Sequence, residues 1–288
     1  SSCISLFAQS IPSTMPLSGQ GVLSMKSFDQ KLLNLMRRDQ IPGGVVAVVK
    51  NYKLYYLRGY GYSDLSHKTP MSVDTMFRVA SVSKSLTAIG IMKLVDQGKL
   101  KLSDRVYPLL GLKPLPGKKV NPRVMRITIK NLLQMRAGYP RWLDPLFGPW
   151  PKSYLTVAGK PLNIPLNCEQ AARYMMSIPL SANPGSTYQY ANINYCLLGL
   201  VISKIHGNKV DEKQYVDYMQ QNIFHPLGRY QMHIAETRKG LQNKLEPSYY
   251  PIAPPPSPHA KNVVVIDSLP YGNDNILQNN AANGGWVA

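Results

Sequence analysis

The sequence predicts an α/β sandwich with a mainly helical insert, and three observations support this fold class. Two apolar, strand-like runs lie near residues 44–50 and 54–60. A helix-rich stretch with many loops follows, from about residue 131 to about residue 260. A short apolar run at 263–266 comes after it and has the composition of a buried strand or core segment. Strands on both sides of a helical block indicate a sheet that is covered by helices and interrupted by an insert.

The 288 residues are enough for one large domain with a substantial core. We assign residues 27–288 to this domain and residues 1–26 to an N-terminal tail. The beginning of the tail is small, apolar and uncharged, which is typical of the remnant of a clipped signal peptide. Ser2–Cys3 also fits the end of a lipoprotein signal. We therefore expect a secreted, periplasmic or cell-envelope protein.

A helix is predicted to begin near Ser81 and to end at Gly98, a typical C-cap residue. Its periodicity predicts a helix that is buried along one side and anchored at its N-terminus. The apolar positions that recur at helical spacing are Ala88, Ile91, Met92 and Val95.

Ser81 and Lys84 open this helix, and no other Ser in the chain has a Lys three residues later. Residues three apart lie on one face of a helix, so the hydroxyl and the amine can hydrogen-bond. The partial positive charge of a helix N-terminus favours an ionising Ser oxygen. Taken alone, the tetrapeptide from Ser81 to Lys84 is weak evidence, because it is also explained by an N-cap Ser followed by an exposed Lys.

Tyr190 and Asn192 form a second candidate pair, since residues two apart in an extended segment can point the same way. A helix-periodic apolar stretch follows them and closes at Gly207, which would hold the pair on a packed element. A Tyr acts as a base only as a phenolate, which a nearby cation such as Lys84 favours. The rival Tyr271–Asn273 is rejected because no apolar helix follows it.

Proline marks two irregular segments. The Pro and aromatic clusters at 140–166 predict an irregular loop beside the site. Residues 251–258 are too rich in Pro for a helix interior or a central strand, so they predict an extended connector.

The segment from Phe77 to Ala88 strongly resembles the active-site segment of the serine β-lactamase-like superfamily. It is most similar to the branch of class C β-lactamases, D-alanyl-D-alanine carboxypeptidases and esterases. Three further stretches resemble that branch in the same order, so the likeness runs from about Ser27 to the last residue. These stretches are 41–64, 127–138 and 183–199.

The resemblance implies a serine hydrolase that works through an acyl-enzyme. Ser81 would be the nucleophile, Lys84 and Tyr190 together would be the base, and Asn192 would orient Lys84 and bind the substrate amide. The implied substrates are a β-lactam, a D-Ala-D-Ala peptide or a small ester. No metal or organic cofactor is expected. The alternative is a catalytically inactive member that serves as an envelope-binding or scaffold protein.

A third motif of the superfamily, His-x-Gly or Lys-Thr-Gly, has no counterpart in the sequence. The chain ends shortly after Gly284-Gly285, and in relatives a similar Gly-Gly run precedes a helix and the last strands. We therefore expect the C-terminal strands, with this motif and one oxyanion donor, to be absent from this chain.

The formal net charge is +18, from 33 Lys and Arg against 15 Asp and Glu. No nucleic-acid-binding module accompanies this excess, so we expect no nucleic-acid partner and regard anionic cell-envelope polymers as a candidate partner. The three cysteines do not have metal-site spacing. Cys196 is interpreted as a small core residue, and a disulfide with Cys168 is conceivable without support from the sequence. Oligomeric state is left open.

Overall fold

The computed structural model describes the chain in several stretches, which form two compact units. The first unit contains the chain up to Phe77 together with Asn243–Tyr250, and the second contains the rest. The described residues are 11–141, 143, 145–146, 156–157, 160–161, 166–236, 242–250 and 281–288. The predicted connector at 251–258, the apolar run at 263–266, the rival Tyr271–Asn273 and most of the predicted loop at 140–166 lie outside them.

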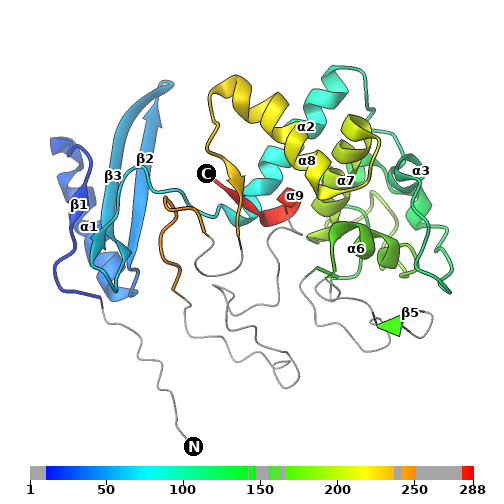
Figure 1. Ribbon diagram of the computed structural model, residues 1–288, viewed down its shortest axis with the longest axis horizontal. Coiled ribbons are helices and arrows are strands. Elements are labelled where there is room, and N and C mark those ends of the chain that lie inside the picture. The colour runs from blue at the N-terminus through cyan, green and yellow to red at the C-terminus, as the bar shows by residue number, and fades with distance from the viewer. Residues whose placement is uncertain are drawn as a thin grey trace, which may run out of the picture. The chain divides into compact units, whose positions relative to one another are not determined.

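The first unit is built on an antiparallel sheet (Figure 1). The long hairpin of β2 (Gly43–Lys50) and β3 (Lys53–Asp64) matches the two strands predicted from the sequence. Asn51 and Tyr52 form its turn with φ of 50° and 59°, as a two-residue turn between twisted strands requires. Two short strands, β1 (Leu17–Ser18) and β4 (Thr69–Pro70), pair with different parts of β3.

Helix α1 (Lys26–Arg38), which follows the 3₁₀ turn η1 (Leu23–Met25), contributes a buried acidic group to this unit. Asp29 is buried and accepts hydrogen bonds from the hydroxyls of Tyr56 and Tyr60 on β3. Arg58 completes the cluster with an ion pair to Asp29 at 3.0 Å. Burial opposes the ionised form, but the two tyrosines and the Arg58 charge hold the pKa of Asp29 below its usual value. The cluster therefore ties α1 to the sheet.

Helices dominate the second unit, and α7 (Ile193–Gly207) is its centre (Figure 1). Every residue of α7 from Ile193 to Ser203 is buried, because neighbouring helices pack around it. These neighbours are α2 (Ser83–Asp96), α3 (Val106–Leu110), α4 (Ile129–Leu133), α6 (Cys168–Met175), α8 (Glu212–Met219) and α9 (Ala281–Gly284).

Shorter elements connect these helices. They are the 3₁₀ turns η2 (Ala80–Val82), η3 (Val124–Arg126) and η5 (His225–Leu227), the π-helical turn η4 (Gln220–Phe224) and the strands β5 (Thr156–Val157), β6 (Lys160–Pro161), β7 (His233–Ile234) and β8 (Trp286–Val287). Strand β8 pairs with β7, and Val287 also bridges Arg78 just before η2.

The predicted α/β class is confirmed, with an antiparallel sheet and a helical block. The helix expected from Ser81 to Gly98 is present as η2 followed by α2, but its buried stripe differs from the prediction. Ile91 is fully buried, whereas Met92 is 40% exposed. The buried side instead continues through Thr87 and Leu94. The helix predicted to close at Gly207 ends there, with Asn208 in a left-handed conformation as its cap.

Candidate active site

The structure brings the four predicted site residues together within the second unit. Lys84 Nζ donates a hydrogen bond to Ser81 Oγ at 3.0 Å and another to Asn192 Oδ1 at 2.8 Å. Ser81 Oγ and the hydroxyl of Tyr190 share a hydrogen bond of 2.8 Å. The predicted proximity is therefore present, while the catalytic roles of these residues stay predictions.

Local backbone structure presents Ser81 at the start of the helix. Ser81 lies in η2, one 3₁₀ turn that leads directly into α2, so Lys84 in the first turn of α2 faces it. The preceding residue, Ala80, has a φ of +44°, a left-handed conformation that costs free energy for a residue with a Cβ atom. The backbone atoms of Ala80 lie about 3.9 Å from a Cβ position built on Gly284, so α9 packs close to this bend.

Tyr190 and Asn192 come from the loop before α7. Asn192 already has helical dihedral angles and is the N-cap residue of α7, so the extended segment expected from the sequence ends one residue earlier. Its side chain points to Lys84 instead of capping the helix. The Tyr190 hydroxyl is also 3.4 Å from Asn192 Oδ1.

Burial separates the roles that these groups can play. Lys84 is 6% exposed, and its ammonium lies 5.1 Å from the centre of the Tyr190 ring. Ser81 is exposed, and Tyr190 is 46% exposed, so a ligand can reach the Ser81 hydroxyl from solvent. A reachable hydroxyl that contacts a buried amine and a phenol is an arrangement that can lose a proton and attack a carbonyl.

A buried polar network that sequence reasoning missed fastens α2 to α8 and to the 281–287 segment. Thr87 Oγ1 lies 2.8 Å from the Tyr215 hydroxyl and donates to the Ala282 carbonyl at 2.7 Å. The indole N–H of Trp286 donates to the same Tyr215 hydroxyl at 2.9 Å, and its backbone N–H donates to Ser83 Oγ at 3.2 Å. Burial raises the pKa of Tyr215 to about 12, although its bonds to Thr87 and Trp286 act the other way. The phenol therefore remains a neutral hydrogen-bonding partner at physiological pH.

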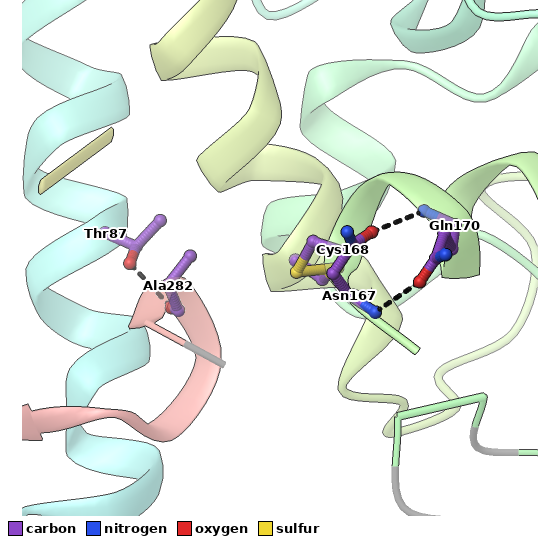
Figure 2. The surroundings of a disulfide bond; sticks show 6 residues. Thr87, Asn167, Cys168, Gln170 and Ala282 are labelled. Atoms are coloured by element: carbon purple, nitrogen blue, oxygen red, sulfur yellow. Dashed lines mark hydrogen bonds between the residues drawn. A yellow bond between two sulfur atoms is a disulfide. The ribbon is translucent and has the colours of Figure 1, made fainter. Parts of the chain in front are cut away.

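A disulfide joins Cys168 at the start of α6 to Cys196, the fourth residue of α7, with the two Cα atoms 5.6 Å apart (Figure 2). Cys196 is fully buried, as expected of a core residue, and the disulfide with Cys168 that was only conceivable from the sequence is present. The sequence did not reveal this bond, because 28 residues separate the two cysteines and only packing shows that they meet. Figure 2 also shows the capping box of Asn167 and Gln170, which fixes the first turn of α6.

The disulfide lies near Glu212, a partly buried acid at the start of α8. Burial raises the pKa of the Glu212 carboxyl to about 8, although the backbone N–H of Cys168 donates to it and opposes the shift. The negative charge of Asp211 adds to the increase. One carboxyl oxygen, Oε1, is buried without a hydrogen-bond partner in the described part of the chain.

Two features are absent from the described residues. These residues contain no group of three or more His, Cys, Asp or Glu placed to hold a metal ion. None of their helices is both long and apolar enough to cross a bilayer.

Comparison with known proteins gives one family match and several relatives. The sequence model of the Beta-lactamase family matches residues 28–281. Protein flp of Staphylococcus aureus (strain N315) is 31% identical over 206 residues, which are 71% of this chain and 37% of that protein. The chain thus covers little more than a third of the length of this curated relative.

Solved structures of similar fold cover nearly the whole chain. The octameric penicillin-binding protein homologue from Pyrococcus abyssi is 24% identical with a TM-score of 0.65, covering 92% of this chain and 54% of that one. EstCE1, described as a hydrolase with promiscuous acyltransferase activity, is 21% identical with a TM-score of 0.65, covering 93% of this chain and 70% of that one. These similarities show a shared fold.

Proposed function

The chain belongs to the Beta-lactamase family, and on that premise we propose that it is a serine acyl hydrolase with Ser81 as its nucleophile. The observation that carries this proposal is the double contact of Ser81 Oγ, which lies within hydrogen-bonding distance of both Lys84 Nζ and the Tyr190 hydroxyl. A Ser hydroxyl is a weak nucleophile until a neighbouring base takes its proton.

In the proposed reaction, Ser81 Oγ attacks a substrate carbonyl while its proton passes to the Lys84–Tyr190 pair. The leaving group departs with a proton from the same pair, and an acyl-enzyme ester remains on Ser81. Water then attacks this ester and releases the acyl group, again with the pair as base. The Ser81 backbone N–H is proposed as one donor to the oxyanion.

Asn192 is proposed to orient Lys84 and to contact the substrate amide. Its Oδ1 accepts a hydrogen bond from Lys84 Nζ at 2.8 Å, which fixes the amine beside Ser81. A base that is held in place by a third group is the usual arrangement around an activated nucleophile.

The proposed substrates are a β-lactam, a D-Ala-D-Ala peptide or a small ester, because all three present a carbonyl to a serine nucleophile. The alternative from the sequence, an inactive member that binds envelope material or acts as a scaffold, predicts no acylation by any probe. The proposal also includes the secreted or envelope location expected from the tail.

Labelling of Ser81→Ala with a fluorescent penicillin and with a fluorophosphonate tests the nucleophile. We expect the variant to lose labelling, because the oxygen that forms the ester is removed. Ser85→Ala is the matched control, since Ser85 is an exposed hydroxyl on the same helix. Equal labelling of Ser81→Ala and the wild type would contradict the assignment, and absence of labelling in the wild type would favour the inactive alternative.

The rate of acylation in Lys84→Ala tests the base. We expect a loss of about 100-fold or more, the usual contribution of a positioned general base. Lys99→Ala removes an exposed amine just beyond the same helix and should keep the wild-type rate. A loss below about tenfold in Lys84→Ala would mean that Lys84 serves the structure only.

A further inference from the structure

An open pocket of about 690 Å³ lies between α4 with the turn that follows it and the loop that carries Tyr190. Its volume is within the usual range for small-molecule sites. The residues that line it are Lys130, Asn131, Gln134, Arg136, Gly185 and Tyr188.

The lining supplies hydrogen-bond donors and positive charge but no carboxylate. Lys130 and Arg136 contribute an ammonium and a guanidinium. The side-chain oxygen of Asn131 accepts the Thr128 backbone N–H within the helix cap, which turns its amide Nδ2 toward Gly185. Tyr188 adds a hydroxyl and is 61% exposed. This set of groups is suited to an anion.

The charges of the pocket are not neutralised by the described part of the protein. Within that part, Lys130 has no ion pair or hydrogen bond from its side chain, and Arg136 has one contact of 3.5 Å to the Gly185 carbonyl. A third cation, Arg123, holds the same loop through the Leu180 carbonyl at 3.0 Å and Asn183 Oδ1 at 2.9 Å. Among the described residues, the two arginines thus contact only carbonyl and amide oxygens, and the Lys130 side chain contacts no polar group. None of the three has a carboxylate as counter-ion in that part of the chain.

The sequence around the pocket has the same imbalance. Residues 105–143 contain nine Lys or Arg and no Asp or Glu. An excess of positive charge at a concave surface raises the local concentration of anions. The pocket therefore favours an anionic group.

We propose that this pocket binds a carboxylate or phosphate group of an anionic ligand, with Lys130 and Arg136 as the charged contacts. Arg136 can bind two oxygens of such a group at once, and Lys130 acts as a point charge. Tyr188 and Tyr190 are two residues apart, so their Cα atoms are no more than about 7 Å apart. The pocket thus borders the same loop that carries Tyr190. The pocket proposal stands whether or not the proposed hydrolase activity is correct.

Calorimetric titration with inorganic phosphate and, separately, with N-acetyl-D-alanine tests the pocket without any need for turnover. We expect the double variant Lys130→Gln/Arg136→Gln to bind at least about tenfold more weakly than the wild type, since two charge-assisted hydrogen bonds are lost. The double variant Lys99→Gln/Lys209→Gln changes the net charge equally at exposed positions and should bind within about twofold of the wild type.

The two probes distinguish the two kinds of anion. N-acetyl-D-alanine represents the carboxylate of a peptide-like ligand, and inorganic phosphate represents the phosphate group of a phosphorylated ligand. The single variant Arg136→Lys keeps the positive charge, so it should bind more tightly than the double variant Lys130→Gln/Arg136→Gln. This comparison separates an effect of charge from damage to the fold. Equal weakening in both double variants would overturn the proposal in favour of diffuse attraction. Failure of the wild type to bind either probe would overturn it as well.

Discussion

Replacing Glu212 with Gln should stabilise the protein above neutral pH. The Glu212 side chain is partly buried at the start of α8, and its buried Oε1 has no hydrogen-bond partner among the described residues. Burial raises its pKa from 4.5 to about 8. Gln has nearly the same shape and cannot ionise, so the variant removes the buried charge and keeps the packing.

The size of the effect follows from the shift in pKa. Between pH 4.5 and pH 8 the carboxyl is protonated in the folded chain and ionised in the unfolded chain, so the folded state binds more protons. Stability therefore falls as the pH rises through this window. Each pKa unit corresponds to about 1.4 kcal/mol, so the wild type should lose about 3 kcal/mol of unfolding free energy from this group between pH 5 and pH 8.

Urea unfolding of the wild type and Glu212→Gln at pH 5 and pH 8, followed by circular dichroism, measures the difference. We expect the advantage of the variant to grow by about 3 kcal/mol from the lower to the higher pH. Glu169→Gln is the control, because the Glu169 side chain is 42% exposed and its loss removes no buried charge. A change below about 1 kcal/mol would refute the reasoning from burial.

Two further predictions concern the ties around the site. Reduction of the Cys168–Cys196 bond, or its replacement by two alanines, should lower the unfolding free energy by about 3 to 4 kcal/mol. The reason is that the bond closes a loop with a sequence separation of 28. An unchanged midpoint in urea unfolding would contradict this prediction. Tyr215→Phe should lower the unfolding free energy by about 1 to 3 kcal/mol, because the Trp286 indole N–H loses its acceptor and Thr87 loses a partner. Thermal unfolding measures this loss. A decrease in Tm of less than about 1 °C would contradict the prediction.

Sequence reasoning reached the candidate site because its chemistry is local. Ser81 and Lys84 are one helical turn apart, and this spacing places their side chains on one face of the predicted helix. The helix that ends at Gly207 could be predicted from its apolar residues at helical spacing, because it packs against its neighbours over most of its length. The pairing of Tyr190 with Ser81 needed the resemblance to a known family, since 109 residues separate them.

Features that depend on how distant elements pack could not be predicted. Met92 belongs to the apolar repeat of its helix, yet it is 40% exposed, because periodicity does not show where neighbouring helices end. Glu212 looks like an ordinary acidic residue in the first turn of a helix, and only the packing of Cys168 against it reveals a buried carboxyl. The same holds for Trp286, whose role depends on residues that lie far away in the chain.

Strand β8 has a consequence for how the protein is made. The Trp286 carbonyl accepts a hydrogen bond from the Val79 backbone N–H at 3.0 Å, and Val287 forms a β-bridge with Arg78. The turn that presents Ser81 is therefore held by residues about 200 positions further along the chain. Contacts of such long separation form slowly. On the ribosome, the bend at Ala80 therefore remains without this support until residue 287 has emerged, about 200 residues after Ser81.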